Sequence, residues 1–208
     1  MAADGEVLRW AGRVLSAEDL DKIDRFLRYT REDENFVAAR TLPGVSAKGS
    51  YFVRGSGHTK TGDYTENPDD YQEVMDRLRK KHAAAAKHVP APLIQRGEAA
   101  RLGVVTIGGC DNAVREALDL LDRQGVPADY MRIRGFPFAP EVEQFLASHS
   151  TNFVIEQNRD AQLKSLLTLE TGIAKDKLRS ILVYGGFPLS SRSVVEEILK
   201  QVAVTADH

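Results

Sequence analysis

The second half of the chain alternates short apolar segments with segments whose apolar residues recur at helical spacing. Strand-like segments rich in β-branched and aromatic residues occur at residues 103–108, 130–134, 152–156 and 180–184. Helical patterns follow them at residues 113–122, 140–148, 160–170 and 191–202. Regular alternation of strands and helices predicts a mostly parallel sheet with helices on both faces. The expected fold class is therefore α/β, with one three-layer domain.

The N-terminal part of the chain lacks this alternation. Ser16 and Asp19 form a capping-box pattern, and the apolar residues after it predict a helix at about residues 17–28. Residues 29–66 contain many turn formers and few periodic signals. An irregular connection of this length is usually either functional or a linker.

A second helix is predicted after this irregular segment. Asn67 is a good N-cap residue, and Pro68 suits the first helical position. The proline-rich stretch 89–93 ends this helix and indicates a domain boundary. We therefore expect a helical and irregular N-terminal extension at residues 1–93 and an α/β domain at residues 94–208.

The second predicted helix has one apolar face and a basic later half. The apolar face consists of Tyr71, Val74, Met75, Leu78 and His82. The basic run 77–82 is typical of a solvated face that complements the negative end of the helix dipole. A phosphate-binding patch is the alternative interpretation.

Composition and charge narrow the class of protein. The chain of 208 residues is 42% hydrophobic and 28% charged, which excludes a collagen-like, disordered or membrane-embedded protein. Its net charge of -2 argues against a nucleic-acid binder. No apolar run approaches the roughly 20 residues of a membrane span, and the N-terminus has no signal-peptide character, so we expect a cytoplasmic protein without a membrane partner. Cys110 is the single cysteine, so the chain alone cannot supply an iron–sulfur cluster or a cysteine-rich zinc site.

The richest candidate chemistry lies in a glycine-rich loop at residues 54–68. Its glycines permit close approach of another molecule, and Arg54 offers a planar fork of donors to a carboxylate or phosphate. His58 can change charge near neutral pH. The loop is suited to binding an anion. The alternative is a mobile surface hairpin whose polar side chains face water.

The turns after the strands are the other candidate sites, because ligands of open parallel sheets bind at the carboxyl ends of the strands. In the turn at residues 107–112, we expect Asp111 to cap the next helix and Cys110 to be a small buried residue; a ligand contact and a reactive thiol are the alternatives. In the turn at residues 156–160, Asn158 or Asp160 is expected to cap the next helix.

Several motifs in order resemble one known family. They are Arg54-Gly-Ser-Gly-His58, Tyr64-Thr-Glu-Asn-Pro68, the run 72–80, the segment 108–118, the segment 156–162 and Tyr184-Gly-Gly-Phe-Pro-Leu189. Together they resemble the C-terminal part of the alpha subunit of 2-oxoacid:ferredoxin oxidoreductases, with most similarity to the 2-oxoglutarate class. The resemblance spans about residues 5–200. It implies that the α/β domain is similar to the transketolase C-terminal domain.

The resemblance also implies a role for the glycine-rich loop. In that family, alpha and beta subunits decarboxylate a 2-oxoacid on thiamine diphosphate, reduce ferredoxin through iron–sulfur chemistry and form an acyl-coenzyme A. By resemblance, Arg54, His58 and Thr65 would hold the carboxylate of the 2-oxoacid. Partners would be a beta subunit, the N-terminal alpha-subunit domains, and, through the complex, ferredoxin and coenzyme A.

The chain departs from the family in what it contains. It lacks the pyrimidine-binding region with its activating glutamate and the Gly-Asp-Gly motif for diphosphate and magnesium. We therefore expect the chain alone to bind none of the cofactors and to be inactive, whereas thiamine diphosphate, magnesium and an iron–sulfur cluster belong to the full complex. Two alternative functions remain. The chain could be a non-catalytic interaction module that retains this fold and forms a homodimer, or a small nucleotide- or coenzyme-binding domain.

Overall fold

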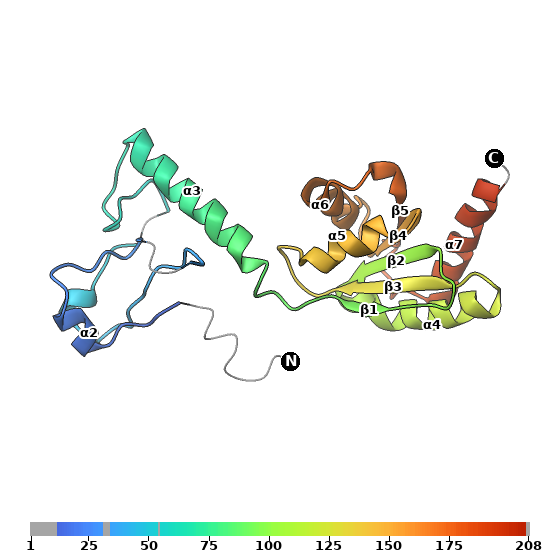
Figure 1. Cartoon of the computed structure of the whole chain (residues 1–208), viewed down its shortest axis with the longest axis horizontal. Helices are drawn as coiled ribbons and strands as arrows, with labels where there is room; N and C mark the ends of the chain where they lie inside the picture. The colour runs from blue at the N-terminus through green and yellow to red at the C-terminus, as the bar shows by residue number, and fades with distance from the viewer. Residues whose placement is uncertain (1–11, 31–33, 54, 207–208) are drawn as a thin grey trace. The chain divides into compact units, whose positions relative to one another are not determined.

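The computed structural model describes residues 12–30, 34–53 and 55–206, and it divides into two compact units between His88 and Val89. Figure 1 shows the helices and strands of both units. No helix in the described ranges is long and apolar enough to cross a lipid bilayer.

The second unit is built on a five-stranded sheet with the strand order β1-β3-β2-β4-β5. Its strands are β1 Leu93–Gln95, β2 Leu102–Ile107, β3 Ala128–Ile133, β4 Thr151–Glu156 and β5 Leu178–Leu182. Strands β2 to β5 pair in parallel, and β1 pairs antiparallel with β3 at the edge. The predicted α/β class with a mostly parallel sheet is confirmed.

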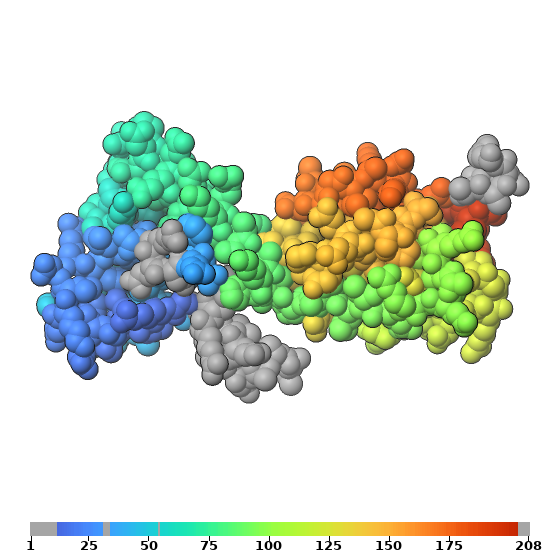
Figure 2. All heavy atoms as spheres, viewed as in Figure 1, coloured from blue at the N-terminus to red at the C-terminus, as the bar shows by residue number. Residues whose placement is uncertain are grey.

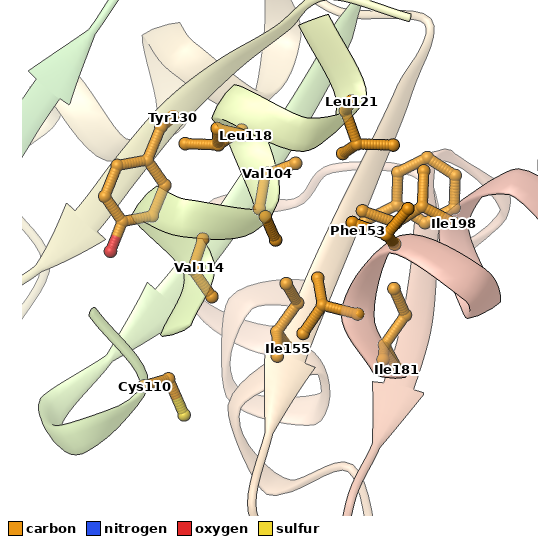
Figure 3. Packing of buried hydrophobic residues seen from close by; sticks show 13 residues of the cluster. Val104, Cys110, Val114, Leu118, Leu121, Tyr130, Phe153, Ile155, Ile181 and Ile198 are labelled. Atoms are coloured by element: carbon orange, nitrogen blue, oxygen red, sulfur yellow. The ribbon is translucent and has the colours of Figure 1, made fainter. Parts of the chain in front are cut away.

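Helices cover both faces of this sheet. They are α4 Asp111–Arg123, α5 Pro140–Ala147, α6 Gln162–Thr171 and α7 Ser191–Ala206, with short 3-10 turns η2 Gly108–Cys110 and η3 Lys175–Lys177. Helices α4 and α7 pack on one face, and α5 and α6 pack on the other. Because side chains alternate along a strand, neighbouring Val104 and Val105 enter different cores. Figure 3 shows the first core, where Val104, Leu121 and Ile198 come from a strand and two helices.

Strand β1 was not predicted from the sequence. Its first residue, Leu93, is the last residue of the stretch that was interpreted as a proline-rich boundary, and all three of its residues are exposed. A strand this short at a sheet edge carries no measurable alternation, so only its pairing with Tyr130, Met131 and Arg132 reveals it.

A buried polar network closes the amino-terminal end of the sheet. The Asp129 carboxylate accepts hydrogen bonds from Arg96, from the Gly97 amide at 2.8 Å, and from His149 Nε2 at 3.1 Å. Burial by itself would raise the pKa of Asp129, but these hydrogen bonds lower it below its ordinary value. The second ring nitrogen of His149 lies 2.8 Å from the carbonyl oxygen of Phe145, so both nitrogens face acceptors.

The first unit contains little regular structure. It holds α2 Ala17–Asp21, a 3-10 turn η1 Ala47–Gly49 and α3 Pro68–Ala85. Its buried apolar cluster consists of only four described residues: Leu15, Leu20, Phe26 and Ala39. The predicted caps are present: Ser16 and Asp19 form the capping box of α2, and Asn67 caps α3.

The helix predicted at residues 17–28 is shorter than expected. It ends at Asp21, although Leu20 and Phe26 both reach the small core. Ile23 and Leu27 are exposed, so the apolar stripe read from the sequence is not one buried face. Asp21 and Asp24 also place negative charge where the helix C-terminus disfavours it.

Candidate functional site

The described part of the glycine-rich loop is a tight hairpin. The Thr59 amide donates to Asp63 O at 2.9 Å, the Gly62 amide donates to Thr59 O at 3.0 Å, and the Thr65 amide donates to Gly57 O at 3.2 Å. A further bond, from the Tyr29 amide to Lys60 O at 3.0 Å, ties the hairpin to the preceding segment. The loop therefore has a defined conformation within its unit.

Two glycines are required by this conformation. Gly62 has a φ of +94°, and a β-carbon there would lie 2.6 Å from Phe52 O. A β-carbon on Gly57 would lie 2.8 Å from Thr65 O. A side chain at Gly57 would force the two hairpin strands apart, and one at Gly62 would push the hairpin turn away from Phe52, because both neighbours are backbone atoms.

His58 is oriented by its neighbours. Its ring packs against the Tyr29 ring, with centroids 4.0 Å apart. Its Nδ1 lies 3.0 Å from Thr59 O, and since a carbonyl oxygen only accepts, this nitrogen donates. In the neutral imidazole, Nε2 is then an acceptor, and in the protonated form both nitrogens donate. His58 is half-buried.

A cavity of about 210 Å³ lies between the hairpin and α3. The hairpin contributes His58, Thr59 and Thr61 to its lining, and α3 contributes Asp70, Glu73 and Arg77. This volume suits a small organic acid. The lining combines hydroxyl groups, an imidazole and charges of both signs.

The two carboxylates of this lining are occupied by neighbours. Lys60 Nζ lies 2.9 Å from Glu73, and the Thr65 hydroxyl donates to Asp70 at 2.9 Å. Arg77 differs, because it has no carboxylate within ion-pair distance among the described residues. Among the described residues its guanidinium donates one long hydrogen bond, of 3.4 Å, to Phe36 O, and its buried Nε has no acceptor there.

Arg77 is a cation in an unfavourable setting. Burial lowers the pKa of its guanidinium, and the neighbouring charge of Arg28 lowers it further. Arg28 is itself half-buried and bonds to Ala39 O at 3.3 Å. An anion entering the cavity would relieve this repulsion between two arginines.

The structure describes two of the three predicted site residues, His58 and Thr65. Arg54 lies outside the described residues. His58 lines the cavity, whereas Thr65 does not. The Thr65 hydroxyl donates to Asp70 and accepts from the Asn67 amide. Arg77 was interpreted from the sequence as part of a solvated basic face, because nothing in the run distinguishes it from its basic neighbours.

The turn after β2 is filled by a polar network. Asp111 does not cap α4 as predicted; it is the first helical residue and makes no cap bond. Its carboxylate accepts from the Tyr130 hydroxyl at 2.8 Å and from Arg115 and Arg132 at 3.1 Å each. Burial would raise the pKa of Asp111, but these donors lower it overall, and burial together with Asp111 raises the pKa of Tyr130.

Cys110 in the same turn is buried, as expected from the sequence. Its Sγ lies 3.8 Å from Gln157 Oε1, in the turn that follows β4. Gln157 therefore connects the turn after β4 with the turn after β2. Figure 3 shows Cys110 at the margin of the core.

Helix α6 is capped by a residue that sequence reasoning missed. Glu156, the last residue of β4, is buried and accepts from the amides of Leu163 at 2.6 Å and Lys164 at 3.1 Å. Asn158 donates to the same carboxylate at 2.8 Å and accepts from the Gln162 amide at 3.3 Å. Asn158 therefore contributes to capping α6, as predicted, but Glu156 makes the two shorter hydrogen bonds to the first helical amides.

The residues of the described ranges do not fit a metal cofactor. No group of three or more His, Cys, Asp or Glu side chains comes together there. We therefore derive no chemical step through a metal or cluster on this chain.

Parts of known proteins resemble this chain in sequence and in fold. No family model matches the chain. The alpha subunit of 2-oxoacid:ferredoxin oxidoreductase 2 from Aeropyrum pernix is 28% identical over 160 residues, which is 74% of this chain and 24% of that protein. The chain thus spans about a quarter of the relative's length.

A solved structure shares the fold of this chain. A 2-oxoglutarate:ferredoxin oxidoreductase from Magnetococcus marinus, with 2-oxoglutarate, coenzyme A and succinyl-CoA bound, matches 88% of this chain and 32% of its own at a TM-score of 0.74 and 22% identity. A Thermoplasma acidophilum alpha chain and a split-gene transketolase reach TM-scores of only 0.38 and 0.42, too low to support an argument. The chain is thus similar in sequence to one such alpha subunit, and it shares its fold with a 2-oxoglutarate:ferredoxin oxidoreductase.

Proposed function

We propose that this chain is part of the alpha subunit of a thiamine-diphosphate-dependent 2-oxoacid:ferredoxin oxidoreductase, acting in the cytoplasm on 2-oxoglutarate. The complete enzyme would oxidatively decarboxylate the 2-oxoacid to an acyl-CoA and reduce ferredoxin. The observation that supports this most is the 160-residue similarity to an alpha subunit, combined with an anion-sized cavity at the glycine-rich loop.

The role of this chain would be to bind and orient the substrate. His58 lies in the cavity wall, and Arg54 and Thr65 belong to the same loop. Arg77 joins these three as a carboxylate-binding candidate because it is a cation without a carboxylate partner in the described residues. A guanidinium suits a carboxylate because it presents two parallel N–H donors.

The cofactors would be held elsewhere in the complex. Thiamine diphosphate, when bound, supplies the carbanion that cleaves the 2-oxoacid, and magnesium holds its diphosphate. A beta subunit and further alpha-subunit domains would supply those sites, along with the iron–sulfur cluster and the contacts to ferredoxin and coenzyme A. We accordingly expect no turnover by the isolated chain.

The experiment is reconstitution of the complex from this chain and its partner subunits, followed by viologen reduction with 2-oxoglutarate and coenzyme A. Arg54→Ala and Arg77→Met should each raise the KM for 2-oxoglutarate by about tenfold or more, since a hydrogen bond to a charged group contributes roughly 1.5–3 kcal/mol. Arg123→Met, at the exposed end of α4, is the matched control and should leave the KM unchanged.

Unchanged KM and turnover in both Arg54→Ala and Arg77→Met would rule out the carboxylate site. Turnover by the chain without any partner would contradict the assignment of the cofactors to other subunits.

A non-catalytic interaction module is the second candidate. The side chains of Leu169 and Phe187 in the second unit are about four-fifths exposed, and binding to a partner could cover them. Failure of every complementing subunit to restore activity, together with stable binding to one of them, would favour this function.

A further inference from the structure

Helix α3 turns polar side chains toward its own unit. Its apolar stripe, which consists of Tyr71, Met75 and Leu78, is exposed. Asp70 and Arg77 are half-buried, and both line the cavity beside the hairpin. Figure 2 shows the loop and the start of α3, both in teal, side by side at the surface of their unit. The cavity therefore contains both an acid and a cation from one helix.

Glu73 and Arg77 are suitably placed for an ion pair that they do not make. They are four residues apart on α3 with the acid first, which is the favoured order for such a pair on a helix. The same spacing gives an ion pair of 3.1 Å between Asp111 and Arg115 in α4. The Glu73 carboxylate instead lies 2.9 Å from Lys60 Nζ, and Arg77 has no carboxylate within ion-pair distance among the described residues. Lys60 therefore competes with Arg77 for Glu73.

The hairpin fixes the position from which Lys60 reaches α3. The Lys60 carbonyl oxygen accepts from the Tyr29 amide at 3.0 Å, which ties its backbone to the preceding segment. Lys60, Glu73 and Arg77 line the cavity of about 210 Å³ and also a second cavity of about 660 Å³. The ion pair between Lys60 and Glu73 therefore lies beside Arg77, where an entering anion would meet it.

We infer that Lys60 is a positioning residue that holds Glu73 away from Arg77 and so keeps the Arg77 guanidinium available to the substrate carboxylate. Without Lys60, the Glu73 carboxylate would pair with Arg77 and occupy the N–H donors that the substrate uses. Glu73 is in this sense a competitor of the substrate within the chain itself. The inference rests on the proposed function, because it takes Arg77 as a carboxylate-binding residue.

The test compares Lys60→Met with Lys60→Met/Glu73→Gln in the reconstituted complex, by viologen reduction with 2-oxoglutarate and coenzyme A. Lys60→Met should raise the KM for 2-oxoglutarate about fivefold, which corresponds to a strong exposed ion pair. Its kcat should stay unchanged, because saturating substrate displaces Glu73 from Arg77. The double variant should return the KM to within about twofold of the wild type, because the competing carboxylate is gone.

A second double variant separates this competition from a change of net charge. Lys60→Met/Asp76→Asn removes the same negative charge, but adjacent residues of a helix do not face each other, so Asp76 does not compete for Arg77. Its KM should stay as high as that of Lys60→Met. Equal recovery of the KM in both double variants would overturn the inference, because net charge would then explain it. A KM that recovers in neither would also overturn it, because Lys60 would then bind the substrate directly.

A measurement on the full chain without partners distinguishes this inference from the proposed function. The proton–nitrogen NMR signal of the Arg77 Nε–H group, assigned by its loss in Arg77→Met, should shift in Lys60→Met and return in Lys60→Met/Glu73→Gln. An unchanged signal in Lys60→Met would overturn the inference. A shifted signal with an unchanged KM in Arg77→Met would support Lys60 as the residue that holds Glu73, and would contradict Arg77 as a substrate contact.

Discussion

Glu156 should contribute more to the stability of the second unit than its place at a strand end suggests. Its buried carboxylate accepts from the amides of Leu163 and Lys164 and from the side chain of Asn158. In Glu156→Ala, the buried Leu163 amide has no acceptor, which costs about 1–3 kcal/mol, and losing a helix cap costs about 1 kcal/mol more. We expect a loss of about 3 kcal/mol in the free energy of unfolding.

A second substitution separates the effect of the negative charge of Glu156 from the effect of its side-chain shape. Glu156→Gln keeps one oxygen acceptor but places an amide NH₂ against a donor, so we expect a smaller loss of about 1 kcal/mol. Glu170→Gln, on the exposed side of α6, is the matched control and should change the free energy by less than about 0.5 kcal/mol.

Urea unfolding of the full chain measures these losses, and hydrogen exchange locates them. The amides of Gln162–Thr171 should lose protection in Glu156→Ala while those of α4 keep theirs. For a unit of this size, a loss of 3 kcal/mol lowers Tm by roughly 10 °C. Equal stability of Glu156→Ala and Glu170→Gln would refute the reasoning that a strand residue caps α6.

Two further predictions follow from the structure. The pKa values of Asp111 and Asp129 are lowered in the folded state, so both carboxylates stabilise the fold above the unfolded pKa of about 3.9, and this stabilisation is lost as pH falls through the folded pKa values. In urea titrations, Asp129→Asn should be less stable than the wild type at pH 7, and its stability should depend less on pH below about pH 4. Stability curves for the variant and the wild type that run parallel with pH would count against this prediction. Gly62→Ala should unfold the hairpin, because Gly62 has a positive φ and Phe52 O would lie 2.6 Å from the added carbon. Gly55→Ala adds its carbon in open space and should leave the hairpin nearly as stable as in the wild type. Hydrogen exchange of the hairpin amides compares the two variants, and equal protection would show that Gly62 is replaceable.

The regular part of the fold is largely readable from residue patterns. Strands β2 to β5 were predicted because the segments are short, rich in β-branched and aromatic residues, and alternate with helical patterns. Local caps such as Asn67 on α3 were also predicted, since donor and acceptor lie within two residues of each other. Strand β1 was missed because three exposed residues leave no periodic signal. Helix α2 was predicted too long because apolar residues continue at helical spacing after Asp21, where the helix ends.

The candidate site was predicted only in part. The glycine-rich loop pointed to His58, because glycines, hydroxyl groups, basic side chains and this histidine are close together in the sequence. Arg77 could not be selected, since its half-buried position depends on how α3 packs against residues some forty positions earlier, including Phe36. The use of Thr65 as a donor to Asp70 was likewise invisible until the loop and the helix start were in place.

The sequence by itself determined the α/β class, the alternation of β2 to β5 with helices, and the caps of α2 and α3, because these follow from contacts between residues close in the chain and from side-chain periodicity. The tertiary structure decided three other features: Glu156 as the cap of α6, Arg77 as a cation without a carboxylate partner in the described residues, and the outward direction of the apolar stripe on α3. Each depends on which face of an element meets its neighbours, and periodicity defines a face without saying what covers it.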